Sequence, residues 1–141
     1  MTDTRGRSAK RLRQVLTADG LTSGVAGLGL AAAPGSVAGL IGAPSASLVF
    51  WVGVGLIAFG LALIWNASRP VSSRGETILI AMLNLAWVAG SAVVVAAGAL
   101  NPLGRWALVL VGIVVLGFAI LELRLLPASG RPDGTLDAAR A

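Results

Sequence analysis

The sequence contains no cysteine, no histidine and no tyrosine among its 141 residues. Without thiol or imidazole groups it lacks the usual ligands of haem, zinc, copper and iron–sulfur clusters, and it has neither a cysteine nucleophile nor the histidine of a charge-relay triad. Its single lysine, Lys10, lies among arginines, so no apolar segment holds an amine for a Schiff base. We therefore expect no enzymatic activity and no bound metal or cofactor.

Charged residues are scarce as well. They make up 12% of the chain, against roughly 25% in soluble domains, while 56% of the residues are hydrophobic and a further 19 are glycine. A domain this short has too much surface to bury so much apolar material, and too few charges to cover what stays exposed. The composition predicts an integral membrane protein.

The uncharged stretches set the number of membrane spans. Between Asp19 and Arg69 lie 49 uncharged residues, which as one helix would extend about 73 Å, more than twice the ~30 Å thickness of the hydrocarbon core. Prolines near its middle, at Pro34 and Pro44, interrupt a helix. We therefore expect two spans here, joined by a short connector over residues 36–42 at the membrane interface.

The second half of the chain holds two further candidate spans. Between Glu76 and Arg105 lie 28 uncharged residues, and the apolar pattern after Arg105 continues past Glu122 until Pro127 ends it. The predicted fold is an all-α, four-transmembrane-helix bundle with spans at about 15–33, 46–66, 76–98 and 104–126. A basic segment, 1–14, precedes the bundle, and a tail, 127–141, is rich in Gly, Pro, Asp and Arg and is predicted to be disordered.

The first span has an alternative interpretation as a cleaved secretory signal, because a basic stretch precedes an apolar one that ends in three alanines at 31–33. Two features argue against cleavage. Asp19 interrupts the start of the apolar stretch, and Pro34 directly follows the small residues. Cleavage would leave three spans.

The basic residues indicate the orientation. Ten of the eleven fall on one side of the predicted topology and only Arg105 falls on the other. Because basic loops stay in the cytoplasm, we expect both termini there, on a face that attracts anionic lipid headgroups. This accounts for the net charge of +5 without nucleic acid as a partner. Arginine outnumbers lysine ten to one beside abundant alanine and glycine, a composition typical of a GC-rich bacterium, so the expected location is the bacterial inner membrane.

Small residues mark one face of the first span. They are spaced four, three and four apart, at Gly20, Gly24, Gly27 and Ala31. Such stripes let two backbones approach closely, which drives helix packing in lipid. The stripe indicates either packing against another span of the same chain or contact with a second copy.

Polar and small residues share one seam of the third span, at intervals of seven: Thr77, Asn84, Ser91 and Gly98. In hydrocarbon the amide of Asn84 needs hydrogen-bond partners. It either fixes the register of the helices or belongs to a site for a polar ligand. Trp87 lies one turn further along the span, and its indole N–H also requires a partner if it is buried.

The fourth span continues the inward pattern. Its lane of small and medium side chains comprises Leu108, Gly112, Val115, Ala119 and, at the cytoplasmic end, Glu122. Asp19 and Glu122 each lie about one turn inside that end, so we predict a polar cluster of Asp19, Asn66, Asn84 and Glu122. Charges at membrane depth are costly and suggest a proton- or ligand-handling site. A structural polar cap neutralised by Arg13, Arg69 and Arg124 is the alternative.

Short strings carry a resemblance to a known family. The string LIGAP at 40–44, the string LNLAW at 83–87, the acidic residue early in the first span and the glutamate late in the fourth resemble small uncharacterised bacterial membrane proteins similar to the DoxX-type four-helix family. The resemblance covers about residues 15–126. It implies a four-helix bundle in a bacterial inner membrane and assigns no catalytic residue.

Two classes of function remain open. The first is a non-catalytic accessory or interaction protein whose small-residue faces support self-association or contact with a larger membrane-protein partner. The second is a small proton-coupled transporter in which Asp19 or Glu122 is the coupling carboxylate.

Overall fold

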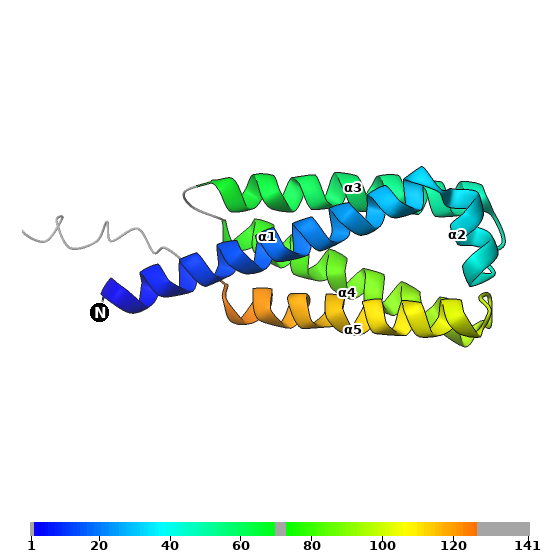
Figure 1. The fold of residues 1–141 in the computed structure, drawn as a ribbon. Helices are drawn as coiled ribbons and strands as arrows, with labels where there is room; N and C mark the ends of the chain where they lie inside the picture. Colours follow the sequence, from blue (N-terminus) through cyan, green and yellow to red (C-terminus); the bar gives the residue numbers. More distant parts are fainter. Residues whose placement is uncertain (1, 70–72, 127–141) are drawn as a thin grey trace, which may run out of the picture.

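The computed structural model describes residues 2–69 and 73–126 and is helical almost throughout (Figure 1). Its helices are α1 (Thr2–Ala32), α2 (Pro34–Ile41), α3 (Ala46–Ser68), α4 (Arg74–Ala96) and α5 (Pro102–Arg124), and these ranges contain no β-strand. Four of the helices are long and apolar enough to cross a membrane: α1 from Gly6 onward, α3, α4 and α5. The predicted all-α bundle with four apolar spans is confirmed.

Helix α1 begins well before the predicted span. The basic segment joins the apolar part as one continuous helix from Thr2, because no proline separates the two and its arginines and lysine are good helix formers. This basic end of α1 projects beyond the other helices (Figure 1). The tail predicted to be disordered, 127–141, lies outside the described residues.

The connector predicted over residues 36–42 is largely a helix, α2. Pro34 occupies its first turn, where a fixed φ and a missing N–H group are tolerated. Gly42 ends the helix in the left-handed conformation, with φ 69°, and its N–H group donates to the carbonyl oxygen of Ala38. Proline therefore interrupts the chain as expected and then starts a new helix across one end of the bundle.

Local hydrogen bonds fix where α4 and α5 begin. Ser73 and Glu76 form a reciprocal capping box at the start of α4. At the start of α5, Oδ1 of Asn101 accepts a hydrogen bond from the Gly104 backbone at 2.9 Å. Nδ2 of the same asparagine donates to the carbonyl oxygen of Leu40 at 2.8 Å, which ties α2 to α5.

Helices α1 and α3 pack with their backbones in close contact. A Cβ atom added at Gly60 would lie 2.5 Å from the carbonyl oxygen of Gly20, and one added at Gly53 would lie 2.7 Å from that of Gly27. Only glycine permits this approach. The small-residue face of the first span is therefore used for packing within the chain.

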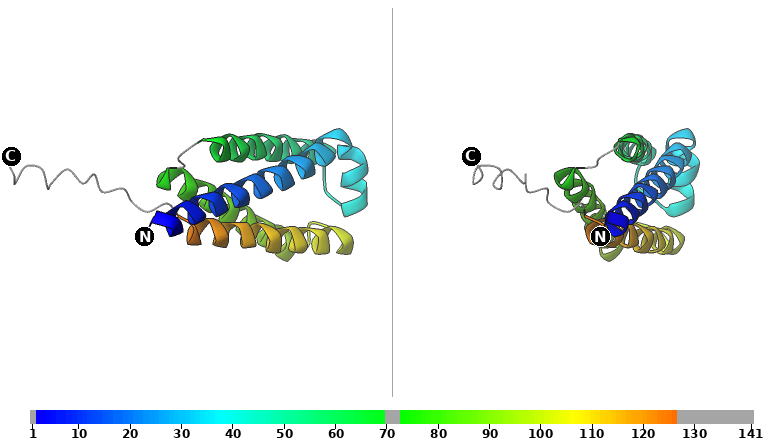
Figure 2. Two further views of the ribbon diagram at one scale, coloured as in Figure 1. Left: turned by 60° about the vertical axis from the view of Figure 1, so that its left-hand side comes forward. Right: turned by 90° about the vertical axis from the view of Figure 1, so that its left-hand side faces the viewer.

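Helices α4 and α5 form a second, antiparallel pair (Figures 1 and 2). Helix α1 contacts α5 across the bundle, whereas α3 and α4 do not pack closely within the described part of the chain. The N-terminal end of α1 and the C-terminal end of α5 lie at the same end of the bundle. An apolar core closes that end and consists of Leu12, Leu16, Leu63, Ala67 and Ile80.

Candidate functional site

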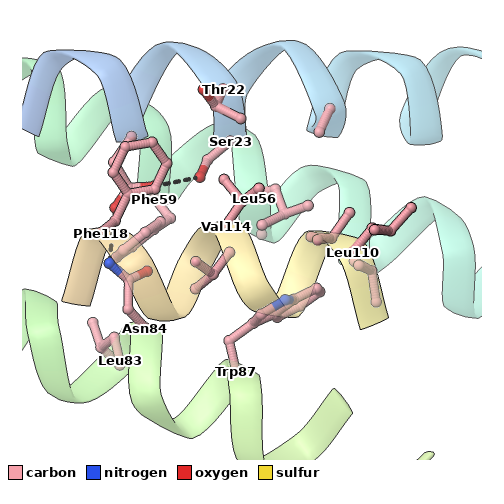
Figure 3. A pocket seen from close by; sticks show the side chains of 16 residues that line it. Thr22, Ser23, Leu56, Phe59, Leu83, Asn84, Trp87, Leu110, Val114 and Phe118 are labelled. Carbon is pink, nitrogen blue, oxygen red and sulfur yellow. Dashed lines mark hydrogen bonds between the residues drawn. The ribbon is translucent and has the colours of Figure 1, made fainter. Parts of the chain in front are cut away.

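Asn84 joins three helices through one amide group. Its Nδ2 atom donates to Oδ2 of Asp19 at 2.8 Å and to Oε2 of Glu122 at 3.2 Å. The three side chains come from α4, α1 and α5, and are only 3%, 1% and 0% exposed. The dashed line from Asn84 toward α1 is visible in Figure 3. We call these three residues the carboxyl–amide cluster.

The two acids of the cluster lie unusually close together. One oxygen of each carboxyl group accepts a hydrogen bond from the same Asn84 nitrogen. Two charged carboxylates repel strongly when they are buried this close. A proton on one of them removes the repulsion and supplies a donor. The geometry suits a site that holds a proton.

The remaining carboxyl oxygens differ in their partners. Oδ1 of Asp19 accepts a hydrogen bond from the Ser23 hydroxyl at 3.2 Å. Oε1 of Glu122 is buried and has no hydrogen-bond partner in the described structure. A buried polar atom without a partner is uncommon in folded proteins, and its presence requires an explanation. Glu122 therefore keeps unused hydrogen-bonding capacity.

A pocket of about 490 Å³ lies beside the cluster and is lined by α1, α3, α4 and α5 (Figure 3). Asp19 and Asn84 belong to its polar end. Its walls are apolar and include the aromatic rings of Phe59, Trp87 and Phe118. A mostly apolar pocket of this size with a few convergent polar groups is typical of a small-molecule binding site.

Trp87 adds a hydrogen-bond donor to the pocket wall. Its Nε1 atom is buried and makes no hydrogen bond within residues 2–69 and 73–126. The ring lies along the pocket from the cluster, one turn after Asn84 on α4 (Figure 3). A buried indole N–H group requires a hydrogen-bond acceptor, and the described residues do not supply one.

The structure does not bring Asn66 into the cluster. Its Nδ2 atom instead donates to Oε2 of Glu76 at 3.0 Å, and Oε1 of Glu76 accepts from Arg69 at 2.8 Å. Of the arginines considered as neutralising groups, Arg69 is thus used at this exposed site, and Arg13 donates to the carbonyl oxygen of Ala67 at 2.8 Å. In the described ranges no salt bridge reaches either buried acid.

The candidate packing residues of the first span fall at a helix contact, and those of the later spans are buried. Those of the first span all lie against α3, namely Gly20, Gly24, Gly27 and Ala31. On the predicted seam of α4, Ser91 is buried together with Asn84. Gly112 and Ala119 are buried on α5, although a Cβ atom at Gly112 would meet no atom within 4 Å.

Several residues of the site are not predicted from the sequence. Gly53 and Gly60 on α3 receive the glycines of α1, and their spacing of seven is a signal that could have identified them. Phe59 and Phe118 line the pocket, but nothing separates them from other apolar residues in the sequence.

No protein-family model, curated protein or solved structure matches this chain. The resemblance to DoxX-type four-helix proteins stays a prediction from short strings.

Proposed function

We propose that this protein is a small, non-catalytic membrane protein that binds a lipophilic molecule inside its helix bundle. One observation supports this most strongly: a pocket of about 490 Å³ lies among four helices that are apolar enough to cross a membrane, and the carboxyl–amide cluster occupies one end of it. The combination fits a ligand that has an apolar body and one polar group.

The residues that line the pocket indicate which of them contact each part of the ligand. Aliphatic and aromatic side chains of α3 and α5 contact the apolar body, and Asp19 and Asn84 orient the polar group. The Trp87 indole supplies a further donor along the wall. These groups bind and position a molecule without a covalent step.

Our proposal for the location is the bacterial inner membrane, with both termini in the cytoplasm. Basic residues gather at the end of the bundle that carries the buried acids, from Lys10 and Arg11 on α1 to Arg124 on α5, while Arg105 lies at the start of α5, at the opposite end. A basic face of this kind is retained in the cytoplasm and attracts anionic headgroups. Both effects support the proposed orientation.

Ligand binding is common to both expected classes of function. An accessory protein would present the ligand to a larger membrane partner or to a second copy through a surface other than the glycine face, which α3 occupies. A proton-coupled carrier would expose the same pocket to each side of the membrane in turn. The buried acids beside the pocket favour the carrier as the second candidate, because protonation would change the charge at the ligand site.

Trp87 offers a direct test of binding. Replacing Trp51, Trp65 and Trp106 by Phe leaves Trp87 as the only indole, and these three side chains are exposed, so the bundle should tolerate the changes. The protein is placed in lipid nanodiscs and titrated with a neutral, brominated lipophile that quenches nearby tryptophan. We expect saturable quenching.

Two matched glycine variants make this test specific. Leucine at Gly55 would take up part of the pocket, since Gly55 lines it and has open space at its Cβ position. Leucine at Gly90 meets equally open space outside the pocket. We expect Gly55→Leu to abolish saturation and Gly90→Leu to keep it. Quenching that rises linearly with probe and is the same in both variants would contradict the proposal.

A further inference from the structure

We propose that the ligand of this pocket is a lipophilic monovalent cation, which binds in exchange for a proton held by Asp19 and Glu122. This inference rests on the proposed function and adds the charge of the ligand to it. Its basis is the chemistry of the pocket lining together with a polar atom of the cluster that lacks a partner.

The charged groups of the site are all acidic. Among the described residues, Asp19 is the only charged one that lines the pocket, and Glu122 lies next to it behind Asn84. In a medium of low dielectric constant, a cation beside these acids is strongly favoured, and an anion is excluded. Oε1 of Glu122, buried and without a partner in the described structure, leaves the cluster with acceptor capacity for a cation or for a proton.

Basic groups on the surrounding helices do not compete for this position. On α1, Arg13 donates to a carbonyl group of α3, and between α3 and α4, Arg69 pairs with Glu76. On α5, Arg124 is exposed at the end of the helix. None of these side chains lines the pocket, so the cation that the cluster favours must come from outside the described residues.

The aromatic walls favour the same class of ligand. Phe59, Trp87 and Phe118 line the pocket from three different helices. The face of an aromatic ring carries negative electrostatic potential and attracts a cation, most strongly where water is excluded. A neutral lipophile would also fit the apolar walls, but it would lack the attraction between a positive charge and the two acids.

The exchange balances charge. When the cation arrives, the O–H bond of one carboxyl group breaks, the electron pair stays on the resulting carboxylate, and the proton leaves to water. One positive charge replaces another, so the site does not accumulate charge within the membrane. Linkage then requires cation affinity to rise with pH, by up to about tenfold per pH unit where the acids titrate.

The experiment compares two probes of the same shape. One is 4-bromobenzyltrimethylammonium, and the other is its neutral isostere with a tert-butyl group in place of the trimethylammonium group. Saturable quenching of Trp87 is measured for both in nanodiscs, at two pH values about two units apart. The variants Asp19→Asn and Glu122→Gln remove one acid each. Glu76→Gln removes an acid outside the pocket and is the matched control.

We expect the Kd of the cation to fall as pH rises, while the Kd of the neutral probe stays constant. Asp19→Asn should weaken cation binding about tenfold or more and change the Kd of the neutral probe by a much smaller factor. Glu122→Gln should change the cation affinity and reduce its pH dependence. Glu76→Gln should behave like the parent protein.

Proton release provides a second measurement that needs no variant. In weakly buffered solution, saturation with the cation should release about one proton per protein, while the neutral probe and empty nanodiscs release none. If the two probes bind equally well and independently of pH, or if cation binding releases no proton, the inference is wrong while the proposed function stands. If neither probe quenches Trp87 saturably, both proposals fail.

Discussion

The two interfaces of the bundle are built on opposite principles. Between α1 and α3, glycines on both helices bring backbone against backbone, so that a single added Cβ atom would meet a carbonyl oxygen at 2.5–2.7 Å. Between this pair and the pair α4 and α5 lies a pocket of about 490 Å³, and a cluster of hydrogen bonds from Asn84 spans the bundle beside it. One interface depends on shape and the other on polar contacts.

This difference separates stability from function. In lipid, helices gain little from the hydrophobic effect and associate through close packing and interhelical hydrogen bonds. The glycine interface uses the first and leaves no room for a ligand. The second interface uses hydrogen bonds from Asn84 to α1 and α5, and a pocket lies beside them.

The largest expected effect is at the glycine interface. In Gly53→Ala, the new methyl group would lie 2.7 Å from backbone atoms of Gly27 and Ala31 that cannot move aside, so we expect a loss of about 2–3 kcal/mol in the free energy of unfolding. Reversible unfolding in mixed micelles measures this loss. The control is Gly55→Ala on the same helix, which has open space and should be neutral or gain up to about 1 kcal/mol. Equal losses in the two variants would refute the close contact.

The second interface should respond to the loss of its central amide. Asn84→Leu removes the donor to two buried carboxyl groups, and we expect the free energy of unfolding to fall by about 1–3 kcal/mol. Ser91→Ala lies two turns further along the same seam and has no interhelical hydrogen bond in the described structure, so its effect should stay within about 0.5 kcal/mol. If Ser91→Ala proves as costly as Asn84→Leu, the cluster does not hold the helices together.

The smallest expected effect lies outside both interfaces. Ser73→Ala removes the N-terminal cap of α4, which should cost about 1 kcal/mol in unfolding free energy without changing ligand binding. The unfolding measurement tests the loss of stability, and Trp87 quenching tests whether ligand binding is unchanged. A change in probe affinity would show that the exposed end of α4 communicates with the pocket.

The sequence predicts the spans well, because the length of each uncharged stretch can be compared directly with the thickness of the membrane. It predicts at what level along the bundle a residue lies, but for Asn66 it does not predict the direction in which the side chain faces. Asn84, Asp19 and Glu122 share a depth and meet, whereas Asn66 is turned toward the first turn of α4 and binds Glu76 instead. Helix rotation is fixed by the glycine contacts between α1 and α3, which involve residues on both partners.

Helix α2 and the pocket are two further features that the sequence does not predict. A proline both ends one helix and suits the first turn of the next, so Pro34 predicts the break but not α2. The pocket is a space left between four helices, and no single residue encodes it. Its aromatic walls look like ordinary apolar residues until the helices are placed.

The central claim is that this space within the bundle receives a ligand, and two neighbouring residues of α1 test it. Both are exposed, but Ala26 lines the pocket, whereas Val25 does not. Because the chain has no cysteine, Ala26→Cys and Val25→Cys each provide a single thiol, whose alkylation by a small uncharged maleimide is timed with and without the neutral lipophile. With free lipophile at about ten times its Kd, we expect about tenfold slower alkylation at Ala26→Cys and no change at Val25→Cys. Equal rates with and without lipophile at Ala26→Cys, or equal protection at both positions, would contradict it.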